Sequence, residues 1–296
     1  MARLHRRWRC TTVACAALTV SLAACGEDSS GSSTGSDVPT SELSEAGRLV
    51  PQEIRDVGTL TVGTDASYPP NEFLDDETIV GLDIDLFDAV ARELNLETNY
   101  ESTEFASIIT ETNKGNYDVG VSSFTINEQR KLEANMVSYF DAGTQWAAQA
   151  GRADAVEPSS PCGLTVAVQV NTLQDQQDLQ PRAEACRAEG DEPLVIQRYE
   201  GQDEATAALT SGAVDAMVAD SPVISFAVRQ SEGEIEPVGK VYDAAPYGYV
   251  IPIENPELAD AIQMALTTLA DDGTYATVLE KWGQSQGAIN DFAINP

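Results

Sequence analysis

Strand-like and helix-like segments alternate along residues 60–282 of the chain. Segments rich in β-branched residues predict strands, and segments whose apolar residues recur every three or four positions predict helices. The expected strands are residues 60–64, 118–123, 164–170, 194–199, 214–219 and 247–253. The expected helices are residues 82–94, 105–114, 128 onward, 203–211, 222–230, 256–270 and 274–282, with a longer polar helical region broken near Pro181. This alternation predicts α/β layers around mostly parallel sheets.

The length of this alternating region bears on the number of domains. Roughly 250 residues are enough for two domains of ordinary size. Residues 143–151 and 241–249 look like segments that cross from one domain to the other. We therefore expect two α/β units joined by two crossing segments.

Residues 1–24 have the pattern of a secretory signal peptide. Four arginines and no acidic residue lie in residues 1–9, and residues 13–24 are mostly apolar. The apolar run is shorter than the roughly 20 residues that span a bilayer. Its end, Leu22-Ala23-Ala24-Cys25-Gly26, resembles the bacterial lipobox, which predicts cleavage before Cys25 and lipidation of its thiol. The alternative is an ordinary secretory signal followed by a chance cysteine.

Residues 25–46 are expected to be a lipidated cysteine followed by a disordered tether. They are rich in Ser, Thr, Gly and acidic residues, and Val38 and Leu43 are their only large aliphatic residues. Such a composition cannot offset the entropy cost of ordering. A flexible coil of about 20 residues spans about 25 Å. The globular part is thus expected on the extracellular face of the cell membrane, held there by the lipid.

Composition excludes several classes of function. The whole chain has a net charge of −31, and removal of residues 1–24 leaves 13 basic against 48 acidic residues, a net charge of −35. Such acidity argues against nucleic acid, which is bound through Lys and Arg. The single histidine, His5, lies in the signal peptide. Ser-His-Asp and Cys-His catalysis and His-based zinc sites are therefore not expected, and we predict no metal and no cofactor.

The cysteines point to one disulfide. Cys10 and Cys15 lie in the signal peptide and Cys25 is expected to be acylated, which leaves Cys162 and Cys186. An even pair in an exported chain predicts a disulfide. Two buried thiols are the alternative.

Polar side chains follow several of the expected strands. Asp65, Thr125 with Arg130, Asn171 with Thr172, and Asp220 come after successive strands. In open α/β sheets, ligands bind beyond the carboxyl ends of the strands. An arginine that binds a carboxylate and an aspartate that accepts an ammonium suit a small zwitterion. From position alone, each residue is more often a cap or a surface charge than a ligand contact, and Asp220 before Ser221-Pro222 has the form of a helix N-cap.

An ordered series of motifs resembles the family 3 extracellular solute-binding proteins, the polar amino acid receptors of ATP-driven importers, in the lipoprotein form of Gram-positive bacteria. The resemblance covers residues 48–285. Its motifs are GTLTVGTDASYPPNEF, GLDIDLFDAVARELN, SSFTINEQRK, LTVAVQVNT, GAVDAMVADSP, PYGYVIPIENPELADAIQMAL and DDGTYATVLEKWG. It implies a type II periplasmic-binding-protein-like (Venus flytrap) fold, with lobe 1 formed by residues 47–145 and 246–296 and lobe 2 by residues 146–245.

The resemblance also implies the site. Arg130 matches the arginine that holds the ligand carboxylate, and Asp220 matches the aspartate that holds the ligand ammonium. The other implied or nearby ligand-binding residues are Asp65, Tyr68, Phe105, Ser123, Thr125, Gln169 and Thr172. The chain departs from the family pattern at Leu173, where a hydroxyl is expected. Asp65 with Gln169 favours a ligand whose side chain is an amide or a cation.

The implied function is that of a monomeric substrate-binding lipoprotein, not an enzyme. It captures a polar L-amino acid by lobe closure and delivers it to a membrane permease of the ABC type. One alternative is an enzyme of the dehydratase kind on the same fold, with Asp65 or Glu72 as general acid or base. Another is a sensory input domain.

Overall fold

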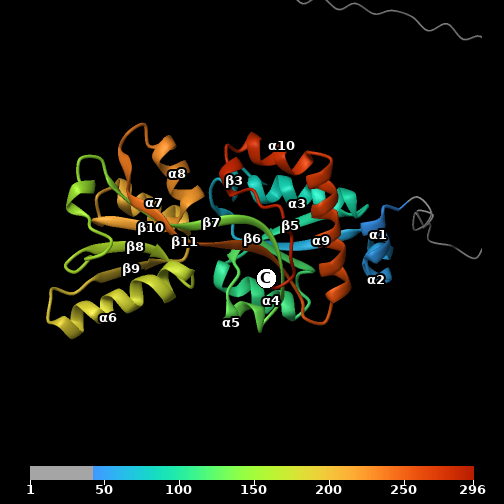
Figure 1. Ribbon diagram of the computed structural model, residues 1–296, viewed down its shortest axis with the longest axis horizontal. Helices are drawn as coiled ribbons and strands as arrows, with labels where there is room; N and C mark the ends of the chain where they lie inside the picture. The colour runs from blue at the N-terminus through green and yellow to red at the C-terminus, as the bar shows by residue number, and fades with distance from the viewer. Residues whose placement is uncertain (1–42) are drawn as a thin grey trace, which may run out of the picture. The chain divides into compact units, whose positions relative to one another are not determined.

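The computed structural model describes residues 43–296 of the chain (Figure 1). The expected signal peptide, Cys25 and most of the expected tether lie outside these residues. Its strands are β1 (Thr59–Thr64), β2 (Ser67–Tyr68), β3 (Glu72–Asp75), β4 (Thr78–Val80), β5 (Glu97–Ser102), β6 (Val119–Thr125), β7 (Asn135–Gln149), β8 (Thr165–Gln169), β9 (Val195–Tyr199), β10 (Ala216–Asp220) and β11 (Ile235–Ile251).

The helices lie between these strands and at the two ends of the described region. They are α1 (Glu45–Leu49), α2 (Gln52–Val57), α3 (Leu82–Glu93), α4 (Phe105–Asn113), α5 (Glu128–Lys131), α6 (Gln180–Glu189), α7 (Gln202–Thr210), α8 (Ser221–Gln230), α9 (Pro256–Asp271) and α10 (Thr274–Lys281). The short helices are η1 (Ala153–Ala155) and η3 (Ser285–Gly287), and the π-helical turn is η2 (Gln174–Leu179). None of the helices described is both long and apolar enough to cross a bilayer.

Eight strands form one mixed sheet in the order β5-β1-β6-β11-β7-β10-β8-β9. β1 is parallel to β5 and β6, and β8 is parallel to β9 and β10. The long strands β7 and β11 are antiparallel to each other and run between the two parallel groups (Figure 1). The expected α/β fold with two lobes joined by two strands is confirmed. We call the elements around β1, β5 and β6 the first lobe and those around β8, β9 and β10 the second lobe.

The crossing between the lobes is a short part of β7 and β11. β10 pairs with β7 up to Thr144, whereas β6 pairs with β11 from Tyr247 onward. The register of the β7–β11 pair shifts on both sides of Tyr242, within this crossing. A Cβ atom at Gly143 would lie 2.6 Å from Val241 Cγ1 and 2.8 Å from the carbonyl oxygen of Tyr242, so only a glycine allows the two strands to approach this closely.

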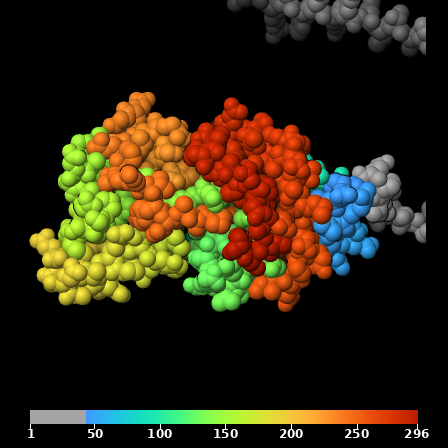
Figure 2. Space-filling view, viewed as in Figure 1, coloured from blue at the N-terminus to red at the C-terminus, as the bar shows by residue number. Residues whose placement is uncertain are grey.

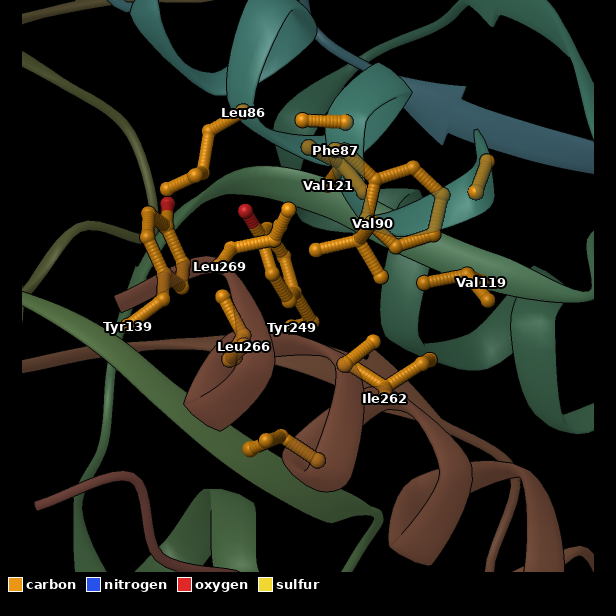
Figure 3. Packing of buried hydrophobic residues seen from close by; sticks show 14 of the residues in the cluster. Leu86, Phe87, Val90, Val119, Val121, Tyr139, Tyr249, Ile262, Leu266 and Leu269 are labelled. Atoms are coloured by element: carbon orange, nitrogen blue, oxygen red, sulfur yellow. The ribbon is translucent and has the colours of Figure 1, made fainter. Parts of the chain in front are cut away.

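The first lobe has the larger hydrophobic core, formed where α3 and α9 pack on the sheet (Figure 3). Leu86, Phe87 and Val90 share one face of α3 because they are spaced by three or four residues, and all three are fully buried. Each such side chain contributes about 1.5–3 kcal/mol through burial. The C-terminal helices, red in Figure 2, cover one face of this lobe.

The expected tether ends earlier than residue 46. Leu43 and Ala46 are buried, and α1 packs on α9. The hydroxyl of Ser44 accepts a hydrogen bond from Gly47 N (2.9 Å) and donates one to the carbonyl oxygen of Glu93 (2.7 Å). The polar composition therefore placed the end of the tether too late in the sequence, because a capped turn and the buried side chains of Leu43 and Ala46 are enough to order these residues.

Cys162 and Cys186 form the expected disulfide, so the alternative of two free thiols is wrong for this structure. It joins the segment before β8 to α6 in the second lobe, across a sequence separation of 24 residues. Closing a loop of that size stabilises the folded chain by roughly 3 kcal/mol in the chain-entropy model.

Candidate functional site

A small pocket, partly open to solvent, lies at the junction of the two lobes. It is lined by Asp65, Tyr68, Phe105, Ser122, Ser123, Thr125, Arg130, Gln169, Thr172, Leu173, Gln174 and Asp220. Every ligand-binding residue expected from the sequence lines this pocket. Ser122 and Gln174 were not expected there.

Arg130 projects from α5, directly after the end of β6. Its Nη1 donates to the carbonyl oxygen of Thr125 (2.8 Å) and its Nη2 to that of Asn171 (3.4 Å). The guanidinium carbon lies 5.3 Å from the ring centres of both Phe105 and Phe124, whose rings stack 4.6 Å apart. This aromatic and carbonyl setting fixes the direction of the guanidinium.

The charge of Arg130 has no direct counter-ion. In residues 43–296, no carboxylate oxygen lies within 4.0 Å of its nitrogens. Burial lowers the pKa of Arg130 from its ordinary value to about 10, and the more distant charge of Asp220 offsets this only in part. A guanidinium carries five N–H donors. The unpaired cation is therefore ready to accept an anion.

Asp220 lies at the end of β10, 6% exposed. One carboxylate oxygen accepts a hydrogen bond from the hydroxyl of Tyr68 (2.8 Å), and the other accepts one from Gln174 Nε2 (2.8 Å). Burial raises the pKa of Asp220, and the hydrogen bonds from Tyr68 and Gln174 oppose that shift. Although Asp220 occupies the N-cap position of α8, its side chain makes no capping hydrogen bond. The capping interpretation of its side chain is therefore wrong, and the carboxylate faces the pocket.

Asp65 forms an acidic end of the pocket. Its Oδ2 accepts hydrogen bonds from Gln169 Nε2 (2.7 Å) and from Phe105 N (3.3 Å). Burial raises the pKa of Asp65, and the nearby charge of Asp203 raises it further. The carboxylates of Asp65 and Asp203 make this end of the pocket negative, which suits a cation or a hydrogen-bond donor.

Thr172 lines the pocket as expected, but its hydroxyl also forms hydrogen bonds within its own turn. Its hydroxyl donates to the carbonyl oxygen of Gln169 (2.9 Å) and accepts from Asp175 N (3.2 Å), so it stabilises its own turn. The turn continues into the π-helical η2. This geometry places Gln174 next to Asp220. The only sequence signal for Gln174 is a polar residue shortly after a buried strand.

Three hydrogen bonds cross the pocket from one lobe to the other. They join Tyr68 to Asp220, Gln169 to Asp65, and Arg130 to Asn171. Outside the pocket, the rings of Phe73 on β3 and Phe226 on α8 lie 6.0 Å apart. The lobes are thus in contact around the pocket.

Within residues 43–296, no group of three or more His, Cys, Asp or Glu side chains is arranged to hold a metal ion. The polar groups of the pocket are instead one unpaired cation, two carboxylates, two amides and several hydroxyls. Such a set can hold a small polar molecule that bears charges of both signs.

Comparison with known proteins gives consistent results. Residues 60–285 match the family described as bacterial extracellular solute-binding proteins, family 3. The arginine-binding protein ArgT of Corynebacterium glutamicum is 36% identical over 296 residues, which is 99% of this chain and 97% of that protein.

Two solved structures share the fold. An ancestral arginine-binding protein bound to arginine has a TM-score of 0.69 and 32% identity, covering 76% of this chain and 98% of its own. An ancestral amino acid-binding protein, a precursor of cyclohexadienyl dehydratase, has a TM-score of 0.69 and 31% identity, covering 78% and 97%.

Proposed function

The chain belongs to the bacterial extracellular solute-binding proteins of family 3, and from this premise we propose that it captures one free amino acid between its lobes and delivers it to a membrane permease. The observation that carries this proposal is the unpaired Arg130 of the first lobe, which shares one pocket with Asp220 of the second.

The α-carboxylate of the ligand would bind Arg130 through two parallel charged hydrogen bonds, which are stronger and more directional than neutral ones. The α-ammonium would bind Asp220, whose carboxylate Tyr68 and Gln174 already orient. Phe105 and Tyr68 would supply apolar contact to the stem of the ligand at low entropy cost. Ser123, Thr125 and Thr172 line the same space and would add polar contacts.

We propose that the ligand carries a cationic side chain, arginine or lysine, in preference to an amide. Asp65 would accept the cation, and the charge of Asp203 adds to the negative potential at this end of the pocket. Gln169 is neutral and already donates to Asp65, so it does not compete for a positive group. The names of the two arginine-binding relatives support this choice.

Lobe closure would couple binding to transport. We place lobe 1 at residues 43–145 and 246–296, since α1 packs on α9, and lobe 2 at residues 146–245, with the crossing of β7 and β11 as the hinge. A ligand shifts the equilibrium toward closure only through contacts that exist in the closed form alone. A zwitterion that bridges Arg130 and Asp220 meets this condition because the two residues belong to different lobes. An ABC-type permease would then recognise the closed form.

The same proposal covers the N-terminal segment. Residues 1–24 would act as a signal peptide, and Cys25 would carry the lipid that anchors a monomer to the extracellular face of the membrane. Metabolic labelling with a fatty acid tests this: the label should enter the wild-type protein and not a Cys25→Ala variant. An equal label in both would show that the cysteine is not the anchor.

Calorimetry tests the binding proposal. Residues 26–296, stripped of bound ligand by unfolding and refolding, are titrated with each common amino acid. We expect one-to-one binding with arginine or lysine as the tightest ligand. Absence of binding to any of them, or tighter binding of glutamate, would contradict the proposal. The same samples are assayed for turnover of amino acids and their precursors, because one relative is a precursor of a dehydratase. We expect none.

A further inference from the structure

Two carboxyl groups, Glu72 on β3 and Asp83 in the first turn of α3, are completely buried beneath the pocket. Neither side chain lines the pocket. In residues 43–296, neither forms an ion pair with a lysine or an arginine. Two buried carboxyl groups without a cation are costly, and the binding contacts proposed above do not use them.

The backbone brings the two groups together. Leu82 N donates to the carbonyl oxygen of Pro70 (2.9 Å) and Asp83 N to that of Asn71 (2.9 Å). Gly81 makes this approach possible, because its φ is +149° and a Cβ atom there would lie 1.9 Å from the carbonyl oxygen of Asn71. The start of α3 is thus fastened to the residue that precedes Glu72.

Both carboxyl groups bind Ser123 of β6, and Glu72 also binds Ser122 of the same strand. Asp83 Oδ2 accepts hydrogen bonds from Ser123 N (3.0 Å), from Ser123 Oγ (3.2 Å) and from the hydroxyl of Tyr139, the last very short. Glu72 Oε1 lies 3.3 Å from Ser122 Oγ, and its Oε2 lies 3.3 Å from Ser123 Oγ. Both serines line the pocket.

The hydrogen-bond donors around Glu72 and Asp83 are too few for two ionised carboxylates. The hydroxyl of Ser123 has one hydrogen and can donate to Glu72 or to Asp83, not to both. Asp83 Oδ1 has no hydrogen-bond donor among the described residues although it is buried. Ser123 Oγ lies 3.3 Å from Glu72 Oε2 and 3.2 Å from Asp83 Oδ2, so both carboxyl groups approach the same hydroxyl. A proton on Glu72 would supply a hydrogen-bond donor that the pair lacks.

The electrostatic surroundings favour Glu72 as the protonated partner. Burial raises the pKa of Glu72 well above its ordinary value, and the charges of Asp83 and Asp65 raise it further. Burial also raises the pKa of Asp83, but hydrogen bonds from Tyr139, Glu72 and Ser123 oppose that shift. Besides Asp65, the titratable groups around the pair are four tyrosines: Tyr68, Tyr100, Tyr139 and Tyr249. Figure 3 shows Tyr139 and Tyr249 stacked, with their hydroxyls pointing the same way.

We propose that Glu72 and Asp83 share one proton at neutral pH and act as positioning residues that hold Ser122 and Ser123 in place at the floor of the ligand pocket. Ser123 needs such support because its φ is +51°, an unusual value for a residue inside a strand. Ser122 Oγ accepts a hydrogen bond from Asp65 N (3.1 Å), so the pair also orients the residue proposed to select the ligand side chain. This second role rests on the proposed function, whereas the shared proton does not.

Infrared spectroscopy of residues 26–296 at pH 7 tests the proton. The carbonyl band of a protonated, buried carboxylic acid should appear in the wild type and be absent from Glu72→Gln. The matched control is Glu77→Gln, which removes an exposed carboxylate from the turn between β3 and β4 and should keep the band. A wild-type spectrum without the band, or an unchanged band in Glu72→Gln, would overturn the shared proton.

Titration with L-arginine tests the positioning role. Glu72→Gln keeps a hydrogen-bond donor toward Asp83 and should weaken binding by about threefold, whereas Glu72→Leu removes all polar contacts and should weaken it at least tenfold. Loss of more than tenfold in Glu72→Gln, or wild-type affinity in folded Glu72→Leu, would refute this role. If Glu72→Leu does not fold, the affinity of Glu72→Gln for L-arginine still decides whether Glu72 has the positioning role. If the wild type binds no amino acid, the proposed function fails while the infrared result stands.

Discussion

Replacing Arg130 with alanine separates a ligand-binding role from a structural one. In the ligand-free protein its guanidinium makes one short hydrogen bond and contacts two aromatic rings, which together stabilise the fold by about 2–4 kcal/mol. Burial lowers its pKa to about 10, which corresponds to about 3 kcal/mol of unfavourable burial of the charge. These two effects nearly cancel. We therefore expect the free energy of unfolding of Arg130→Ala to change by about 1 kcal/mol or less.

The effect on ligand binding should be much larger. Removing one partner of a buried charge pair costs about 2–5 kcal/mol, because the other charge is left without a partner. The affinity for arginine should therefore fall about 30-fold to 5,000-fold. No other described residue replaces the lost cation, because no other lysine or arginine in residues 43–296 lines the pocket.

The assay combines calorimetry with thermal unfolding in the absence and presence of L-arginine. Without ligand, the melting temperature of Arg130→Ala should lie within about 4 °C of the wild type. With ligand, only the wild type and the control variant Lys114→Ala, which removes an exposed partner of Glu111, should gain stability. A large drop in melting temperature without ligand, or an affinity that falls less than tenfold, would refute the reasoning and make Arg130 a structural residue.

Four further outcomes can be measured. Asp220→Asn should weaken arginine binding at least about 30-fold by calorimetry, because the ammonium loses its buried counter-ion; a smaller loss would place the ammonium elsewhere. Asp65→Asn should weaken arginine binding more than glutamine binding, and equal losses would show that Asp65 does not contact the side chain. Phe226→Ala should weaken binding by about fivefold, because it removes a contact between the lobes that lies outside the pocket. Stopped-flow measurements should show faster ligand release, and an unchanged release rate would show that this contact does not stabilise the closed form. The free energy of unfolding should fall as the pH rises above about 5, by at most about 1.4 kcal/mol per pH unit, because folded Glu72 keeps a proton that the unfolded chain releases. In denaturant titrations at several pH values, Glu72→Gln should show a smaller fall than the wild type. An equal fall in both proteins would contradict this prediction.

The local sequence pattern predicted most of the helices and strands whose conformation does not depend on contacts with distant parts of the chain. The helix expected at residues 82–94 is α3, and the strand expected at residues 164–170 is β8. α3 carries its signal in the spacing of its apolar residues, and β8 carries it in its β-branched residues. The ordered motifs also predicted which residues line the pocket, because the spacing of motifs along the chain reflects a fold that this family shares.

Two long strands were missed for most of their length. The first part of β7, residues 135–142, falls in the region expected to be helical from residue 128 onward, whereas the helix α5 ends at Lys131; this part of β7 shows no alternation of polar and apolar residues. The first part of β11 contains Pro237, Gly239 and exposed charged residues, which argue locally against a strand. Pairing of β11 with β7 overrides this local preference.

By itself, then, the sequence determined the α/β class, the disulfide partners and the unlike charges that follow the strands. Only the tertiary structure decided that Asp220 turns away from its helix toward Tyr68 and Gln174, and that Glu72 and Asp83 lie together without a cation. The physical reason is the range of the interactions. Helices, turns and charge content depend on residues near in sequence, whereas the environment of a buried polar group depends on strands and helices that meet only when the sheet has formed.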